Sequence, residues 1–260
     1  MAGKQIKPST WWPSLNRLDS THHGLVGYWP LWEGAGPQAA DVAGLFPGTL
    51  DAGTDWVSQG ILTDANGDDV SIPGIAARMT GSTAFTMMTV VNLESEGIGT
   101  IFGYFFSLSD VSQSEARISF SDTGQRVFAV LNGTGISAGV GSWPGFNRDV
   151  VVIARYSAGE TNGSQIWLNG ELKGSATISG AISISGNGLI ANRADGLRAL
   201  DGTTKACAVW DRALSSPEIE QISYRPYGLI TPPNNAAILS AGVAAPAAAV
   251  RRNMTLLGVG

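Results

Sequence analysis

Short strand-like segments recur along most of this chain, and they limit its possible folds more than any other feature. Each segment combines β-branched and aromatic residues, and glycine, asparagine, aspartate and serine are frequent between them. Many short strands separated by turn residues are typical of an antiparallel sandwich or jelly roll. We therefore predict an all-β fold. The clearest strand segments lie at residues 25–29, 85–93, 100–107, 116–121, 126–131 and 149–156.

The sharpest local signal is the dipeptide Asn169-Gly170. Strand-like residues 164–168 precede it, and residues 171–173 continue the pattern after it. Asn-Gly favours a type I′ turn because both central residues of that turn need a positive φ. The sequence therefore predicts a two-residue β-hairpin at this point.

One short helix is expected near the end of the strand-rich region. Ser216 can cap its amino end, Pro217 suits the first helical position, and Glu218 lies near the positive end of the helix dipole. The residue before a proline avoids the α conformation, so the helix should end before Arg225-Pro226.

Composition excludes several classes of site. The chain has one cysteine, Cys207, which allows neither an internal disulfide nor a cysteine zinc cage. Its two histidines, His22 and His23, leave little for imidazole metal sites or a Ser-His-Asp triad. We expect no cofactor and no enzyme activity, and we expect Cys207 to be a small buried apolar residue.

Charge is distributed unevenly over a chain of net charge −5. Residues 1–23 carry three cations and one acid, and residues 231–260 carry two cations and no acid, which leaves the middle acidic. A nucleic-acid-binding protein needs a dense basic patch, so we expect no nucleic acid partner. No run approaches the ~18 apolar residues of a membrane span, and residues 1–8 lack the apolar stretch of a secretory signal. We expect a soluble protein made in a cytoplasm, without a membrane partner.

The two ends differ from the middle in kind. Residues 231–260 begin with a Pro-Pro pair and continue as alanine, glycine, valine and leucine without a clear period, and residues 1–23 hold adjacent tryptophans. Exposed adjacent tryptophans cost solubility, so the ends are either plain tails or arms that dock on a neighbouring subunit. We divide the chain into an N-terminal arm (1–23), a jelly-roll domain (24–230) and a C-terminal arm (231–260). The candidate assembly residues of the arms are Trp11, Trp12, Arg251, Arg252, Leu256 and Leu257.

Several motifs resemble one known family. Residues 24–36 read Gly-Leu-Val-Gly-Tyr-Trp-Pro-Leu-Trp-Glu-Gly-Ala-Gly, which is similar to the opening strand of laminin-G-like, concanavalin A-like jelly rolls. Residues 64–73, the paired segments 152–156 and 166–172, and residues 208–219 resemble later strands and the closing helix of that family. The resemblance covers about residues 24–228. It implies a concanavalin A-like (laminin-G-like) jelly-roll β-sandwich with one short helix and extended terminal arms.

The resemblance also implies a function. A jelly roll of this kind, flanked only by arms, looks like the laminin-G-like proteins of tailed bacteriophages. It implies a non-enzymatic virion structural protein, either a head decoration or a minor capsid protein, assembled in the host cytoplasm. Its partners would be other virion proteins, the major capsid protein or copies of itself. The alternative is a glycan-binding module of a tail or fibre that contacts a surface glycan of the host.

Candidate ligand sites are few. Asp64, Asn66 and Asp68 have the spacing that begins a calcium loop, but the later loop positions lack the required glycine and glutamate. We therefore expect a polar turn before a strand, with a calcium site as the alternative. Trp143 and Phe146 flank a Pro-Gly turn and are the best candidates for an exposed glycan contact, although loop aromatics more often anchor the loop than bind a ligand.

Carboxylates that might act as a glycosidase pair are Glu94 with Glu96, and Glu33 with Asp211. Neither pair lies in the clustered pattern expected on one inner strand. We therefore expect no catalytic residue.

Overall fold

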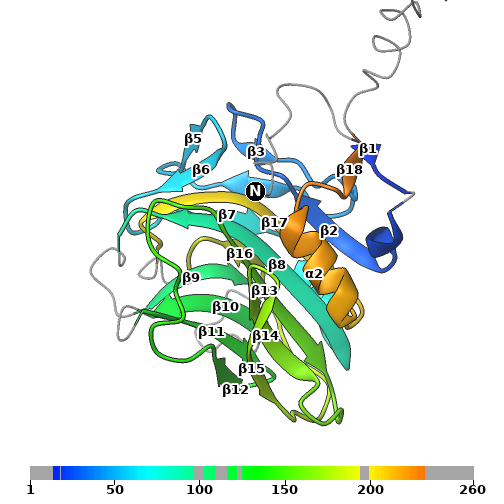
Figure 1. Cartoon of the computed structure of the whole chain (residues 1–260). Coiled ribbons are helices and arrows are strands. Elements are labelled where there is room, and N and C mark those ends of the chain that lie inside the picture. The colour runs from blue at the N-terminus through cyan, green and yellow to red at the C-terminus, as the bar shows by residue number, and fades with distance from the viewer. Residues whose placement is uncertain are drawn as a thin grey trace, which may run out of the picture.

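The fold is a sandwich of two antiparallel sheets, described here from a computed structural model (Figure 1). The structure describes residues 14–17, 19–95, 102–108, 116–121, 125–193 and 199–231. We call the two large sheets sheet I and sheet II. This architecture confirms the prediction of an all-β sandwich.

Sheet I has eight strands in the order β12 (Thr134–Ser137), β11 (Arg126–Leu131), β10 (Ala116–Ser121), β9 (Phe102–Ser107), β16 (Gly188–Ile190), β7 (Val70–Ile72), β4 (Gly48–Leu50) and β3 (Gln38–Ala39). Sheet II has the order β15 (Glu171–Ala176), β14 (Ser164–Leu168), β13 (Val150–Ser157), β8 (Ala84–Leu93), β17 (Gly202–Trp210), β6 (Gly60–Thr63) and β5 (Asp55–Val57), and β2 (Leu25–Trp29) also pairs with β17.

Each of the six clearest predicted strand segments is a strand, namely β2, β8, β9, β10, β11 and β13. The sequence did not reveal β3 to β6, β12 and β16, which are two to four residues long. Such short strands show too little alternation to be recognised. Strand β7 lies within residues 64–73, where the family resemblance implied a strand.

The predicted hairpin is confirmed between β14 and β15. Asn169 and Gly170 have φ of 50° and 84°, as a type I′ turn requires. The Asn169 side chain also accepts a hydrogen bond from the backbone N–H of Val151 at 2.9 Å, which ties the turn to β13.

The space between the sheets holds the main core. Its largest side chains are fully or almost fully buried, and they are Trp29, Phe85, Phe105, Phe106, Phe120 and Tyr156. Cys207 is buried here as predicted, and burial raises the pKa of its thiol to about 12, so it is an unreactive apolar residue.

A second apolar cluster lies on the outer face of sheet II, where helix α2 (Ser216–Tyr224) covers it (Figure 1). Ile219 and Ile222 of α2 pack in the same cluster as Trp167 and Trp210. These tryptophans are buried between the sheet and the helix rather than between the two sheets.

Helix α2 begins one residue earlier than predicted. Ser215, not Ser216, is its N-cap, and Glu218 accepts hydrogen bonds from the Ser215 backbone N–H and hydroxyl at 2.9 and 2.8 Å. The helix ends before Arg225, as predicted. A second, five-residue helix, α1 (Ile75–Met79), was not predicted.

The described part of the predicted N-terminal arm belongs to the domain. Strand β1 (Ser14–Leu15) pairs with β18 (Ile230–Thr231), and a 3₁₀ turn (Ser20–His22) follows it. The carbonyl of Thr21 accepts a hydrogen bond from the Trp210 indole at 2.7 Å. The expected boundary at residue 24 therefore falls inside a segment that is bonded to the sandwich, whereas Trp11, Trp12 and the C-terminal candidates lie outside the described residues.

Strand β17 is the centre of sheet II. It pairs with β8 on one edge, and on the other edge it pairs first with β6 and then with β2. The close fit to β6 depends on Gly60, where a Cβ atom would lie 2.1 Å from the Thr204 carbonyl oxygen.

Gly60→Ala should therefore destabilise the fold by about 1–3 kcal/mol, because the added methyl group forces β6 away from β17. The measurement is the free energy of unfolding in urea. Gly135→Ala on β12 is the matched control, since nothing lies within 4 Å of its added Cβ. Equal stability of both variants would contradict the packing described for β17.

Glu218 should make α2 sensitive to acid. Hydrogen bonds from Arg212, assisted by those from Ser215, lower the pKa of this carboxyl from 4.5 to about 2 against the effect of burial. A carboxyl group whose pKa is lowered by folding stabilises the folded state at pH values above its unfolded-state pKa. This stabilisation disappears as the pH falls towards its folded-state pKa. The stability difference between the natural chain and Glu218→Gln should thus be constant above pH ~5 and vanish near pH 2, as measured by urea unfolding across pH. A difference that persists unchanged at pH 2 would refute this role.

Candidate functional site: a polar pocket on sheet II

The outer face of sheet II changes from apolar to polar along its strands. On β8, Met88 and Val90 belong to the cluster under α2, whereas Asn92, the next outward residue, lines a pocket. On β17, Ala206 lies in the same cluster and Thr203 lines the same pocket. The pocket therefore begins where the apolar cluster ends.

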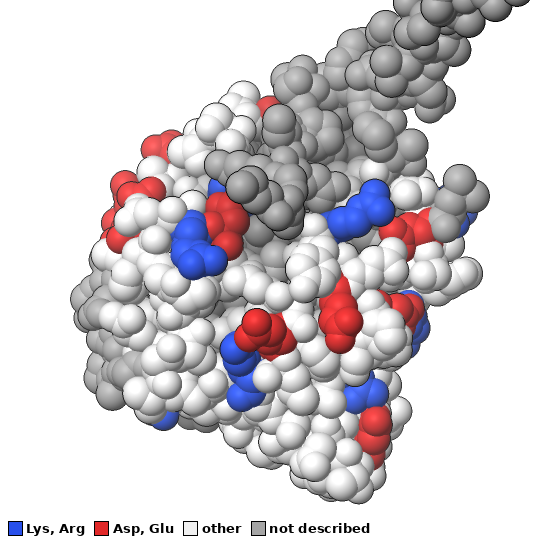
Figure 2. All heavy atoms as spheres, in the orientation of Figure 1, with Lys and Arg blue, Asp and Glu red and all other residues white. Residues whose placement is uncertain are grey.

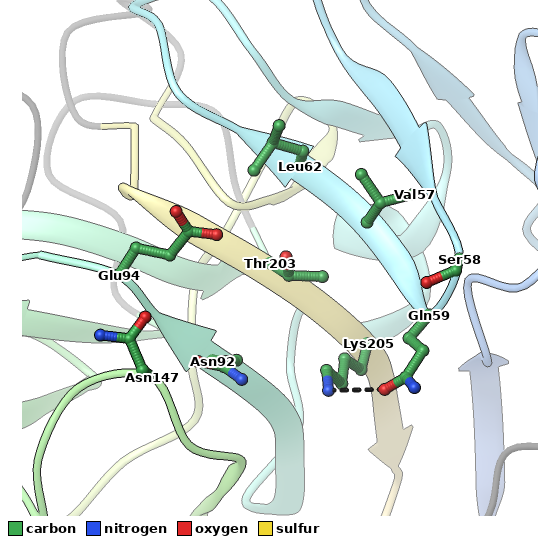
Figure 3. Close-up of a pocket in the computed structure, with 9 residues that line it drawn as sticks. All are labelled: Val57, Ser58, Gln59, Leu62, Asn92, Glu94, Asn147, Thr203 and Lys205. Carbon is green, nitrogen blue, oxygen red and sulfur yellow. Dashed lines mark hydrogen bonds between the residues drawn. The ribbon is translucent and has the colours of Figure 1, made fainter.

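Most of this face carries no charge; several acidic and basic side chains on it adjoin one another, and further acidic side chains lie without a basic neighbour towards the upper left of the view (Figure 2). The pocket has a volume of about 350 Å³. Figure 3 shows Glu94 and Asn147 at one end, Lys205 and Gln59 at the other, and Thr203 between them. The complete lining is Val57, Ser58, Gln59, Leu62, Asn92, Glu94, Asn147, Thr203 and Lys205.

Lys205 reaches the pocket because β17 bulges at this residue. The register with β8 shifts between Thr204 and Ala206, at the point where the other edge of β17 changes partner from β6 to β2. A bulge leaves one residue unpaired and redirects its side chain. Only 9% of the Lys205 side chain is exposed, and its ammonium donates to Asp149 Oδ1 at 2.6 Å and to Gln59 Oε1 at 2.9 Å.

Asp149 connects Lys205 to the neighbouring strand. Its Oδ1 also accepts from the Asn92 amide NH2 at 3.1 Å, while the buried Oδ1 of Asn92 has no hydrogen-bond partner in the described part of the chain. Burial raises the pKa of Tyr227, and the nearby Asp149 carboxylate adds to the rise. A fixed polar network thus forms one wall of the pocket.

Sequence reasoning missed this pocket. The sequence held one indication of it: Lys205 is the single charged residue in the strand-like run of residues 203–210. A lone charge in a buried strand needs a partner. The partner, Asp149, is distant in sequence and could not be identified from the pattern.

The prediction that Trp143 is an exposed loop aromatic is wrong. Its side chain is 5% exposed and stacks on Phe105, with ring centroids 5.8 Å apart. Phe120 meets the same ring edge-on at 5.2 Å, and the half-buried Phe146 packs against Phe120. The loop aromatics complete the core on the sheet I side, and the Trp143 ring has no face left for a sugar.

The candidate calcium residues also do not converge. Asp68 is buried, and its Oδ2 accepts from the backbone N–H groups of Asp64 and Ala65 at 3.0 and 2.9 Å. Asp64 and Asn66 are exposed, so the carboxylate of Asp68 stabilises a turn. Within the described ranges, no three His, Cys, Asp or Glu side chains are grouped as a metal site requires.

The other carboxylates considered have structural partners. Glu33 accepts from the Ala40 backbone N–H at 2.5 Å, and Asp211 pairs with Arg78 at 2.5 Å. Glu94 lines the pocket, and Glu96 lies outside the described residues.

In the part of the chain that the structure describes, no helix has the length and apolarity to cross a membrane.

The two-sheet architecture with one covering helix defines a lectin-type β-sandwich. The sequence matches the laminin G-like family model described as "Concanavalin A-like lectin/glucanases superfamily" over residues 64–220. The chain belongs to this superfamily. A comparison with curated protein sequences finds no match.

Solved structures share the fold at low sequence identity. Trypanosoma rangeli sialidase in complex with sialic acid aligns with a TM-score of 0.62 and 16% identity, over 78% of this chain and 33% of the sialidase. The chain thus spans about one third of that enzyme's length. Domain 4 of AbnA, a GH43 extracellular arabinanase from Geobacillus stearothermophilus in complex with arabinotriose, aligns with a TM-score of 0.57 and 13% identity, over 76% of this chain and 98% of the domain.

Trp143→Ala separates a core role from a surface role. Loss of a buried aromatic ring should lower the free energy of unfolding by about 3–5 kcal/mol. Chemical denaturation followed by circular dichroism measures the change. A variant as stable as the natural chain would show that the ring is not part of the core.

Proposed function

We propose that this chain is a non-catalytic carbohydrate-binding module whose site is the pocket of Asn92, Thr203 and Lys205. The observation that carries the proposal is the pocket's mixed lining. Hydroxyl, amide and charged groups surround it, and Val57 and Leu62 supply apolar surface. A sugar presents hydroxyl groups around its edge and C–H groups on its faces, so it matches such a lining. Small-ligand sites commonly combine apolar walls with a few placed polar groups.

The pocket's size favours a short piece of a glycan. Its volume of about 350 Å³ is at the small end of the ~300–1,000 Å³ of small-molecule sites. The Lys205–Asp149–Asn92 network holds the polar wall in place before a ligand arrives, which reduces the ordering cost of binding.

The lining favours binding over hydrolysis. Glycosidases of the common type use two carboxyl groups on either side of the scissile bond. Glu94 is the single carboxylate among the residues that line the pocket. Asp149 is not among the lining residues, and its Oδ1 already accepts hydrogen bonds from Lys205 and Asn92.

The comparisons support this class of function. The superfamily description names lectins as well as glucanases, and the arabinanase domain that aligns over 98% of its length was solved with arabinotriose. Arabinotriose is the ligand of that arabinanase domain, and the step from it to this chain is part of our proposal.

The structural role in a bacteriophage virion, with capsid partners, stays a prediction. It depends on the end segments, whose candidate docking residues lie outside the described ranges. A carbohydrate-binding module on a virion would be compatible with both predictions from the sequence.

The test is binding of the purified chain to a panel of oligosaccharides, measured by isothermal titration calorimetry. Asn147→Gly removes one polar group from the pocket and keeps the positive φ of 55°. Combined with Thr203→Val, it should weaken binding about tenfold or more, because each lost hydrogen bond contributes about 0.5–1.5 kcal/mol.

The matched control is Asn162→Gly, an exposed asparagine with φ of 53° in the loop between β13 and β14. Its affinity should equal that of the natural chain. Absence of binding to every saccharide, or equal affinities in the pocket and control variants, would refute the proposed site.

A further inference from the structure

The charged groups around the pocket do not balance. Lys205 is paired with Asp149 at 2.6 Å, and this pair is neutral overall. Glu94 remains as an additional acid at the opposite end of the pocket (Figure 3). The described groups therefore give the pocket one net negative charge.

The one cation of the lining is already engaged. An ammonium has three N–H donors, and Lys205 uses two of them on Asp149 and Gln59. None of the lining residues is an arginine, the side chain that binds carboxylates in a bidentate manner.

A hydrogen-bond acceptor lines the other end of the pocket. The exposed Glu94 carboxylate is acceptor-only when ionised. Sugar hydroxyl or ammonium groups can donate to this carboxylate, whereas a carboxylate or sulfate cannot.

We propose that this pocket selects saccharides without negative charge, and that Glu94 is the residue that rejects uronic and sialic acids. The inference rests on the proposed carbohydrate-binding function. An acidic sugar would place its carboxylate near the Glu94 carboxylate, and the one cation of the lining, Lys205, is already paired. Loss of hydration without a partner charge is unfavourable, and such unpaired charges are a common source of specificity.

Arginines are present on the opposite sheet. Arg117 stacks over Tyr104 at 5.0 Å and Arg126 over Phe128 at 4.6 Å, both on sheet I. An acidic glycan would find guanidinium groups there and not in the sheet II pocket. A site on sheet I would therefore favour acidic glycans, whereas the sheet II pocket would favour glycans without negative charge.

The experiment compares α-1,4-linked galactotriose with trigalacturonic acid, whose C6 carboxylates replace hydroxymethyl groups. Calorimetric titrations use the full chain at moderate ionic strength, together with a wider set of neutral trisaccharides that includes arabinotriose. The natural chain should bind neutral members of the set and bind trigalacturonic acid at least tenfold more weakly than galactotriose. Glu94→Lys should reduce or reverse this preference.

The matched control is Glu220→Lys, the same charge change at an exposed position on α2 that does not line the pocket. It should leave the preference unchanged, which separates a local effect from the net charge of the chain. An equal shift in both variants would overturn the role of Glu94.

Failure of the inference and failure of the proposed function give different results. Tight binding of trigalacturonic acid, lost in Arg126→Ala and kept in Glu94→Lys, would overturn the selectivity and move the site to sheet I. Absence of binding to every neutral and acidic saccharide would overturn the proposed function itself.

Discussion

The shared edge of β17 is the constraint on which the rest of the structure depends. A strand has two edges for pairing, yet β17 has three partners, because β6 and β2 divide one edge between them. The bulge at Lys205 lies at this division. Beyond it, Cys207 and Val209 enter the core between the sheets, while Ala208 and Trp210 carry the cluster beneath α2. One irregularity in one strand therefore sets both the apolar surface that holds the helix and the start of the pocket.

The same constraint explains where a ligand can reach sheet II. Helix α2 covers the apolar part of its outer face. The segment before β2 is held to this part of the sheet by the hydrogen bond that the Trp210 indole donates to the Thr21 carbonyl. The polar part of this face, at Thr203 and Lys205, lies outside the area that α2 covers, and the pocket occurs there. The fold alone does not define a function, because one sandwich supports many. The proposal of a carbohydrate ligand, and of a ligand without negative charge, therefore rests on the side chains of the site.

Much of the fold could be predicted from sequence because its signals are local. The Asn169-Gly170 turn and the alternation of residues 126–131 depend on backbone preferences within a few residues, and both are confirmed. Trp143 was misplaced for the opposite reason: its neighbours Phe105 and Phe120 are brought to it by tertiary packing. At Asp68 the sequence left a polar turn and a calcium loop open, because the spacing of carboxylates does not reveal whether backbone N–H groups already occupy them. The pocket joins residues from β6, β8 and β17 and has no contiguous motif.

The Lys205–Asp149 pair is hard to explain by stability alone. Lys205 is nearly buried, and the cost of removing an ammonium from water commonly offsets the attraction to its partner, so a well-packed apolar residue is often as stable. The outer face of β17 already carries such residues at Ala206, Ala208 and Trp210, and continuing them would extend the cluster under α2. The charge instead interrupts the cluster, keeps this end of the sheet open and polar, and orients Asn92 through Asp149. A residue that separates a covered apolar face from an open polar pocket has a physical role that fold stability does not require.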